Sequence, residues 1–185
     1  MNMAEDSHSH AHLLEALSSL NQIGSDINRL GPEDQASVGT TLRLIVESAC
    51  KVVPGSAAVI YSYEQASQTF APASRVSAGR PVPFSIQGPR SDGLGMRAMH
   101  LRRRVLSYEE GGDAPSLESP GGPRVVACFP LVVAERAVGV LYVYLFEKRR
   151  FTRLELLMLD NFVNQAAMAI YHAQRLSDVQ RNLAR

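Results

Sequence analysis

Two long apolar runs joined by a short turn constrain the fold of this chain more than any other feature of its sequence. Residues 124–133 (RVVACFPLVV) and 137–146 (AVGVLYVYLF) are separated only by the polar turn AER. Runs rich in β-branched and aromatic residues on either side of a short polar turn predict a β-hairpin. Because the second run is almost wholly apolar, both faces of its strand must be covered, which places it at the centre of a sheet.

Shorter extended runs earlier in the chain supply further strands. Residues 57–63 (AAVIYSY) and 69–76 (TFAPASRV) flank the polar turn EQASQ and predict a second hairpin. Residues 105–108 (VLSY) predict one more short strand. We therefore expect an antiparallel sheet of about five to six strands.

Two segments between these strands favour irregular structure. Residues 77–86 contain Gly79, Pro81 and Pro83, which are poorly suited to central strands and to helices. Residues 109–123 are dense in Gly, Pro, Ser and acidic residues, a composition typical of a long loop.

Helices are predicted on either side of the strands, which makes the fold class α+β. Residues 32–53 have apolar side chains three or four positions apart, and residues 93–101 predict a short helix with Ser91 or Asp92 as its N-cap. Thr152 is placed to cap a long helix that runs toward the last residue. One face of that helix carries an apolar row suited to packing on the sheet, made of Leu156, Leu159, Val163, Ala166, Ile170 and Ala173.

An apolar seam near the start of the chain has no obvious partner within a single copy. Its residues follow the spacing of a helix that packs on another helix: Leu13, Ala16, Leu20, Ile23, Ile27 and Leu30. The last helix has a second apolar row beside its sheet-facing row, made of Phe162, Ala169, Leu176 and Leu183. We therefore expect a parallel homodimer in which the first and last helices of two copies form a four-helix bundle.

Composition restricts the partners and the cellular location. The 19 basic and 18 acidic side chains leave a formal net charge of +1, too little to attract nucleic acid or an anionic membrane. No apolar run approaches the roughly 20 residues of a membrane span, and the first residues lack the order of a signal peptide. We therefore expect a cytoplasmic protein that binds neither nucleic acid nor membranes.

The two cysteines are predicted to be structural. Cys50 and Cys128 lie in apolar sequence and have neither a metal-binding nor a disulfide-framework spacing. We expect both thiols to be reduced, with Cys128 facing the core. The histidines of SHSHAH, residues 7–12, are interpreted as part of a polar leader rather than as a metal site.

Two stretches of the sequence are together similar to one known family. RVVACFPLVVAERAVGVLYVY followed by RRFTRLELLMLDNFVNQAAMAIYHAQRL has two core strands about a short turn, then Phe-Thr, an acidic residue and an alanine-rich helix. DGLGMRAMHLRRRVLSYEE has a short helix followed by a strand. Both stretches resemble parts of GAF domains, and the resemblance covers residues 31–175. It implies a non-catalytic sensory module of bacterial signal-transduction proteins, such as two-component systems.

The resemblance also implies a domain organisation. A disordered leader over residues 1–12 and a dimerisation helix over 13–30 precede a GAF-like domain over 31–175. Residues 176–185 then begin a helical linker to an output domain such as a histidine kinase. A module of this kind binds a small molecule and relays its state through the terminal helices. The alternatives are a ligand-free dimerisation module and, more distantly, an enzyme similar to free methionine sulfoxide reductases.

No motif in the sequence identifies a ligand or a cofactor. Cyclic-nucleotide-binding relatives carry an Asn-Lys pair, then Phe, three residues and Asp-Glu; here Phe151 and Glu155 are present, but Leu156 follows and no such pair precedes. Neither cysteine is placed to bond a bilin. His100 is the one histidine near the pocket region of the family, and we interpret it as an exposed side chain at a basic helix end rather than a haem ligand.

No catalytic residue is predicted. The reductases that resemble this family need a nucleophilic thiolate and a resolving cysteine. Only Cys128 is placed near a pocket, and the predicted loop over residues 109–123 contains no second thiol. No GxSxG, HExxH or P-loop pattern occurs either, so we expect no enzyme activity.

A ligand pocket is predicted between the sheet and residues 77–101, bordered by the loop over residues 109–123. Irregular segments over a sheet are where such sites collect, and apolar walls with a few polar groups suit small ligands. The predicted wall consists of Tyr61, Phe84, Met96, Met99, His100, Tyr108 and Phe129.

Overall fold

The structure, a computed structural model, describes residues 35–71, 75–82, 89–109 and 120–184. Before residue 35 it describes only residues 11, 14, 15, 17, 18, 21, 22 and 25. The predicted seam from Leu13 to Leu30 and the predicted wall residue Phe84 therefore lie outside the described residues, as does most of the loop over residues 109–123.

The strong hairpin of the sequence forms the centre of the sheet. Strands β5 (Val125–Val133) and β6 (Arg136–Leu145) pair antiparallel through a two-residue turn. Both turn residues, Ala134 and Glu135, have positive φ, 46° and 65°. A turn with two positive φ angles matches the twist of the flanking strands, which explains why a tight connection forms without Asn-Gly.

The other strands complete a six-stranded antiparallel sheet, as the sequence predicts. Strand β1 (Ala57–Glu64) pairs with β6 on one side, and on its other side with β2 (Thr69–Phe70) and β3 (Val76–Gly79). Strand β4 (Val105–Leu106) pairs with β5.

The prediction that residues 77–86 are irregular is wrong for residues 77–79, which belong to β3. The prolines that favoured the irregular structure lie beyond the end of this edge strand. Gly79 ends it with a φ of 85°, and a Cβ atom there would lie 2.3 Å from the Ser56 carbonyl oxygen. Glycine therefore permits the close approach of β3 to the start of β1.

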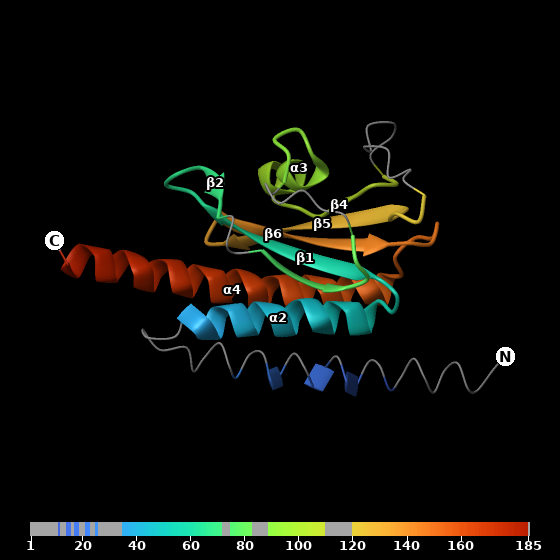
Figure 1. The fold of residues 1–185 in the computed structure, drawn as a ribbon, viewed down its shortest axis with the longest axis horizontal. Coiled ribbons are helices and arrows are strands. Elements are labelled where there is room, and N and C mark those ends of the chain that lie inside the picture. Colours follow the sequence, from blue (N-terminus) through green and yellow to red (C-terminus); the bar gives the residue numbers. More distant parts are fainter. Residues whose placement is uncertain are drawn as a thin grey trace.

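Of the three helices whose bounds are given below, two cover one face of the sheet and the third covers the other face (Figure 1). Helices α2 (Gln35–Val52) and α4 (Arg153–Leu183) lie side by side under the sheet, and α3 (Leu94–Leu101) packs on the opposite face. Thr152 caps α4 as predicted, in a capping box: its hydroxyl accepts from the Glu155 N–H, and the Glu155 carboxylate accepts from the Thr152 N–H. The predicted cap of α3 is wrong, because Gly93 is the N-cap and no side chain bonds there.

Alternation along the strands divides the buried side chains into two clusters. The larger cluster lies between the sheet and helices α2 and α4, and includes Phe129, Leu141 and Leu159. The smaller cluster lies between the sheet and α3.

The placement of Phe162 and Ala169 on a dimer surface is wrong, because both are fully buried in the larger cluster. The buried face of α4 is wider than one row, since the helix packs on the sheet and on α2 at once. Among the described residues, no helix is long and apolar enough to cross a membrane.

Candidate functional site

The sheet face beneath α3 carries most of the aromatic side chains of the strands. Tyr61 on β1 and Tyr142 on β6 are buried there, among Val59, Val126, Cys128 and Val140. Tyr63, Phe70 and Tyr144 are partly buried and pack against the same cluster. Because residues two apart in a strand share a face, Tyr142 and Tyr144 point to the same side of β6.

These rings contact one another in a continuous series. Tyr142 stacks on Tyr144 with centroids 5.8 Å apart and also meets Tyr61 edge-on at 5.9 Å. Phe70 then meets Tyr61 at 6.3 Å and Tyr63 at 5.0 Å, both edge-on. Offset and edge-on pairs of this kind are favourable, so the five rings form one ordered aromatic patch, which we call the tyrosine face.

Burial affects the acidity of three hydroxyls on the tyrosine face. Burial raises the pKa of Tyr142, Tyr144 and Tyr61, because the phenolate loses solvation. The positive charge of Arg75 acts in the opposite direction on Tyr61 and Tyr144. The face therefore combines flat apolar surfaces, neutral hydroxyls and a nearby guanidinium, a combination suited to a small planar molecule with a polar or anionic edge.

Helix α3 covers part of this face very closely. A Cβ atom on Gly95 would lie 1.8 Å from the Tyr142 hydroxyl oxygen, and that hydroxyl has a backbone hydrogen bond with Gly95. Only glycine allows the helix to approach the ring at this position. The space over Tyr142 is thus filled by α3 itself.

The structure brings three of the seven predicted wall residues to the α3 side. Tyr61 and Met99 are buried in that cluster and Met96 packs against it. Phe129 lies in the cluster on the other side of the sheet, because it alternates with Cys128 along β5. Tyr108 packs against the same opposite cluster, with Arg150 5.3 Å from its ring centroid. His100 is exposed.

Sequence reasoning missed Tyr63, Phe70, Tyr142 and Tyr144. The alternation in VLYVYL was the available signal, because it places the two tyrosines of β6 on one face of the sheet and Leu141 and Val143 on the other face. Because nearly every residue in this run is apolar, the two faces of the strand are hard to distinguish from the sequence.

Both cysteines have free thiols. Cys128 is fully buried opposite Tyr142 in the strand register, and burial raises its pKa. Cys50 on α2 is half-buried against the larger cluster, and burial raises its pKa as well. The two thiols therefore lie on opposite sides of the sheet. No group of three or more metal-binding side chains occurs in the part of the chain that the structure describes.

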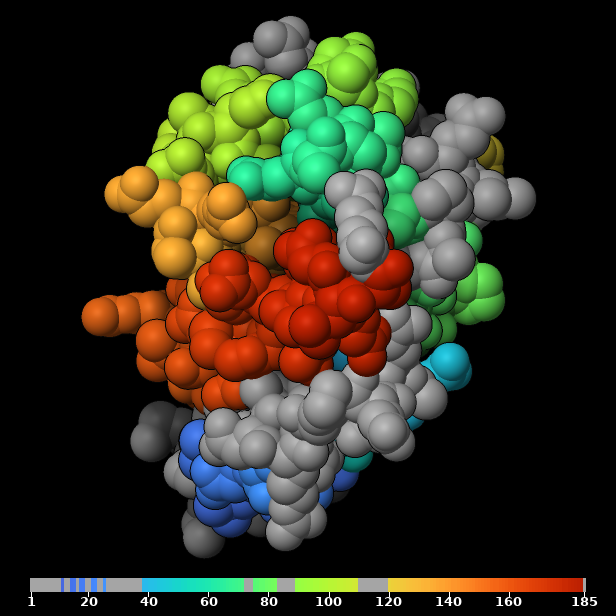
Figure 2. Space-filling view, turned by 90° about the vertical axis from the view of Figure 1, so that its left-hand side faces the viewer, coloured from blue at the N-terminus to red at the C-terminus, as the bar shows by residue number. Residues whose placement is uncertain are grey.

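A second feature is a groove of about 410 Å³ beside the C-terminal half of α4. Figure 2 shows this end of the molecule, with the red end of α4 below the β1–β2 turn and beside the orange β5–β6 turn. The groove is lined by Glu64, Gln65, Ala66, Arg136, Val138, Tyr171, Gln174, Arg175, Asp178 and Arg181.

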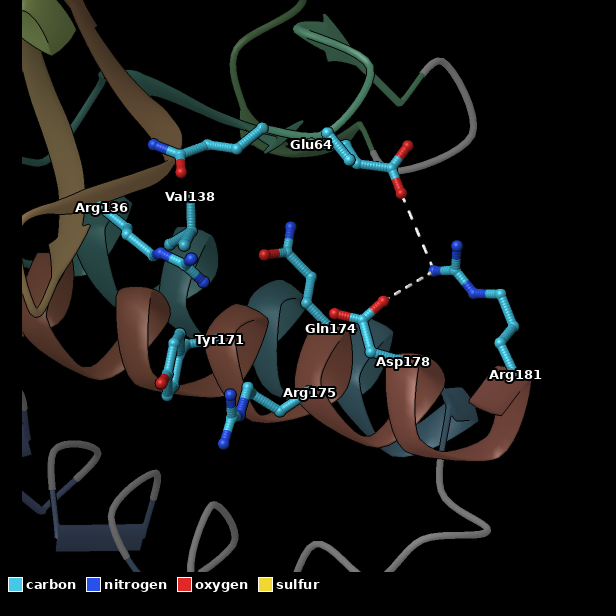
Figure 3. Close-up of a pocket in the computed structure, with 10 residues that line it drawn as sticks. Glu64, Arg136, Val138, Tyr171, Gln174, Arg175, Asp178 and Arg181 are labelled. Carbon is cyan, nitrogen blue, oxygen red and sulfur yellow. Dashed lines mark ion pairs between the residues drawn. The ribbon is translucent and has the colours of Figure 1, made fainter. Parts of the chain in front are cut away.

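Helix α4 is joined to the end of β1 at this groove. The Gln174 side-chain amide donates to the Tyr63 carbonyl oxygen at 2.9 Å, and Arg181 lies 3.8 Å from the Glu64 carboxylate (Figure 3). Arg181 also pairs with Asp178 at 3.2 Å. Since exposed ion pairs contribute little, the partly buried Gln174 bond is the stronger of these links.

Comparison with known proteins agrees with this fold. The sequence model of a family described as the GAF domain matches residues 35–170, from the start of α2 into α4. No match was found among curated proteins.

Several solved structures share the fold at low sequence identity. The GAF domain of an Acinetobacter phosphoenolpyruvate-protein phosphotransferase is 19% identical, with a TM-score of 0.65, over 86% of this chain and 94% of that chain. A free methionine-R-sulfoxide reductase from Neisseria meningitidis is 16% identical, with a TM-score of 0.63, over 86% and 90%. The second GAF domain of DevS from Mycobacterium smegmatis is 22% identical, with a TM-score of 0.54, over 79% and 99%. By the family match over most of its length, this chain belongs to the GAF domain family.

Proposed function

We propose that this GAF domain is a sensory module that binds a small molecule on the tyrosine face and relays its state through α4. The aromatic patch carries the proposal, because it places five rings in contact on the face of the sheet where α3 is the only helix that the structure describes. Helix α3 fills the space over Tyr142, so the ligand lies over Tyr61 or Tyr144. Its class is a planar molecule with a polar or anionic edge directed toward Arg75.

The relay runs from the rings to α4 through the end of β1. Phe70 contacts both Tyr61 and Tyr63, and the Tyr63 carbonyl accepts the hydrogen bond from Gln174. A ligand that moves Tyr61 therefore changes the position of the strand end that holds α4. At 31 residues, α4 is about 46 Å long and extends the effect toward an output domain such as a histidine kinase.

The dimer surface that we propose is the outward stripe of α4. Leu157, Met168 and Val179 are 57%, 39% and 53% exposed and lie eleven residues apart, about three helical turns. Leu154 and Leu183 lie on the same stripe, 45% and 83% exposed. A stripe of this length on a single helix face suits a second copy of the same helix across a two-fold axis.

We further propose that the module is not an enzyme. Methionine sulfoxide reduction needs a reactive thiolate, whereas burial holds Cys128 protonated, and Cys50 lies across the sheet from it. The two free thiols also suit a reducing cytoplasm, where we place the protein.

A ligand-free dimerisation module is the second candidate, and the tight contact between Gly95 and Tyr142 favours it. A thermal-shift screen over nucleotides, haem, 2-oxo acids and amino acids separates the two, because a ligand that binds the folded state raises the melting temperature. We expect at least one compound to stabilise the protein. Tyr144→Phe should weaken that effect, while Tyr108→Phe, which changes a tyrosine on the other side of the sheet, should leave it unchanged. If no compound stabilises the protein, the dimerisation module is the better account.

A further inference from the structure

The groove beside α4 is separate from the tyrosine face and is built from three elements. The end of β1 contributes Glu64, β6 contributes Arg136, and α4 contributes Tyr171, Arg175 and Arg181. Its volume of about 410 Å³ is in the range of small-molecule sites. Buried Val138 provides an apolar floor, and the remaining lining is mostly polar.

The charges of the groove are unevenly matched. Among the residues that the structure describes, both acidic side chains of the groove pair with Arg181, at 3.8 Å for Glu64 and 3.2 Å for Asp178. None of the ion pairs within the described part of the chain involves Arg136 or Arg175. Figure 3 shows Tyr171 and Arg175 next to each other on α4, below Arg136. This end of the groove therefore presents two guanidinium groups and a hydroxyl, and no carboxylate that the structure describes is paired with either guanidinium.

We propose that the Arg136, Tyr171 and Arg175 end of the groove binds a small organic molecule that carries two oxyanion groups, carboxylate or phosphate. Guanidinium groups match the two oxygens of such anions, and the Tyr171 hydroxyl supplies a further donor. A molecule with two anionic groups offers one to each arginine, whereas a single sulfate or phosphate ion offers only one. Because Arg136 is on the sheet and Arg175 on α4, the ligand holds α4 against the sheet.

Titration of the whole chain with citrate and with pyrophosphate, followed by NMR chemical shifts, tests this site. Sodium chloride at equal ionic strength separates binding from screening. We expect saturable shifts around Tyr171 and Gln174 with at least one of the two probes, and their relative affinities then assign the preference for carboxylate or phosphate. Arg136→Gln and Arg175→Gln should each weaken binding about tenfold, since each removes one charge-assisted contact.

Arg103→Gln is the matched control, because it removes an exposed arginine that does not line the groove. Its affinity should equal that of the unaltered chain. The proposal is overturned if neither probe gives saturable shifts, or if the Arg136→Gln/Arg175→Gln double variant binds as well as the control. These outcomes do not depend on whether a ligand occupies the tyrosine face.

Discussion

Individual residues fix how closely the elements of this domain approach one another. Gly95 and Gly39 both lie in helices, but their surroundings differ completely. A Cβ atom on Gly95 would lie 1.8 Å from the Tyr142 hydroxyl oxygen, whereas the structure describes no atom outside the α2 backbone within 4 Å of the corresponding position on Gly39. The first glycine is required by packing, and the second only costs backbone entropy.

This contrast predicts opposite effects of the same substitution. Gly95→Ala should lower the free energy of unfolding by about 1–3 kcal/mol, because the methyl group overpacks the contact between α3 and Tyr142. Gly39→Ala should raise it by about 0.5–1 kcal/mol through helix propensity. Urea denaturation measures both, and equal effects of the two substitutions would show that α3 does not pack on Tyr142 in this way.

The protonated groups beneath α3 predict a loss of stability at alkaline pH. Burial raises the pKa of Cys128 and Tyr142 above their ordinary values of 9.0 and 10.0. At pH values below these ordinary pKa values, the contribution of the two buried groups to the free energy of unfolding is fully present. At higher pH the unfolded chain releases protons that the native state retains, so the free energy of unfolding falls as pH rises.

Tyr142→Phe removes one such proton while keeping the ring. Between pH 10 and 11, the fall in the free energy of unfolding should become shallower by up to about 1.4 kcal/mol per pH unit. Urea denaturation at a series of pH values provides the measurement. Identical slopes for the two proteins would mean that the Tyr142 hydroxyl is not held protonated by the fold.

Among the elements, local patterns in the sequence predicted the central hairpin, the Thr152 cap of α4 and the antiparallel sheet. They did not predict β3, because an edge strand that ends at Gly79 is hard to distinguish from the proline-containing segment after it. They also placed Phe162 on a dimer surface, since the pattern of a single helix does not show that α2 and the sheet together cover a wide face of α4. Phe129 was predicted to lie in the pocket wall. It lies on the other face of the sheet, because Cys128, its neighbour in β5, faces α3.

The link between α4 and the end of β1 gives a prediction at the scale of elements. Gln174→Ala removes the donor to the Tyr63 carbonyl, a partly buried bond that contributes about 1 kcal/mol. Amide hydrogen exchange should become faster in residues 174–183 of α4 and stay unchanged in residues 156–170, which are anchored by the core. Asn182→Ala, an exposed position on the same helix, should change neither region. Unchanged exchange in Gln174→Ala would remove this link from the proposed relay.

At the scale of the whole molecule, the outward stripe of α4 predicts the oligomeric state. Sedimentation at tens of micromolar should show a dimer for the unaltered chain. A Met168→Glu/Val179→Glu double variant should give a folded monomer, because it places charges in the apolar interface. Leu101→Glu, which changes an exposed apolar residue on α3, should remain dimeric. A monomeric unaltered chain would refute the proposed dimer.

Binding of a small molecule to the tyrosine face should alter α4. Hydrogen exchange of the full chain, measured with and without a compound that stabilises it in the thermal-shift screen, tests this coupling. We predict increased protection around Tyr61 and Tyr144 together with a change in residues 174–183 of α4. Protection confined to other parts of the chain, or a change on the tyrosine face that leaves α4 unaffected, would contradict the account.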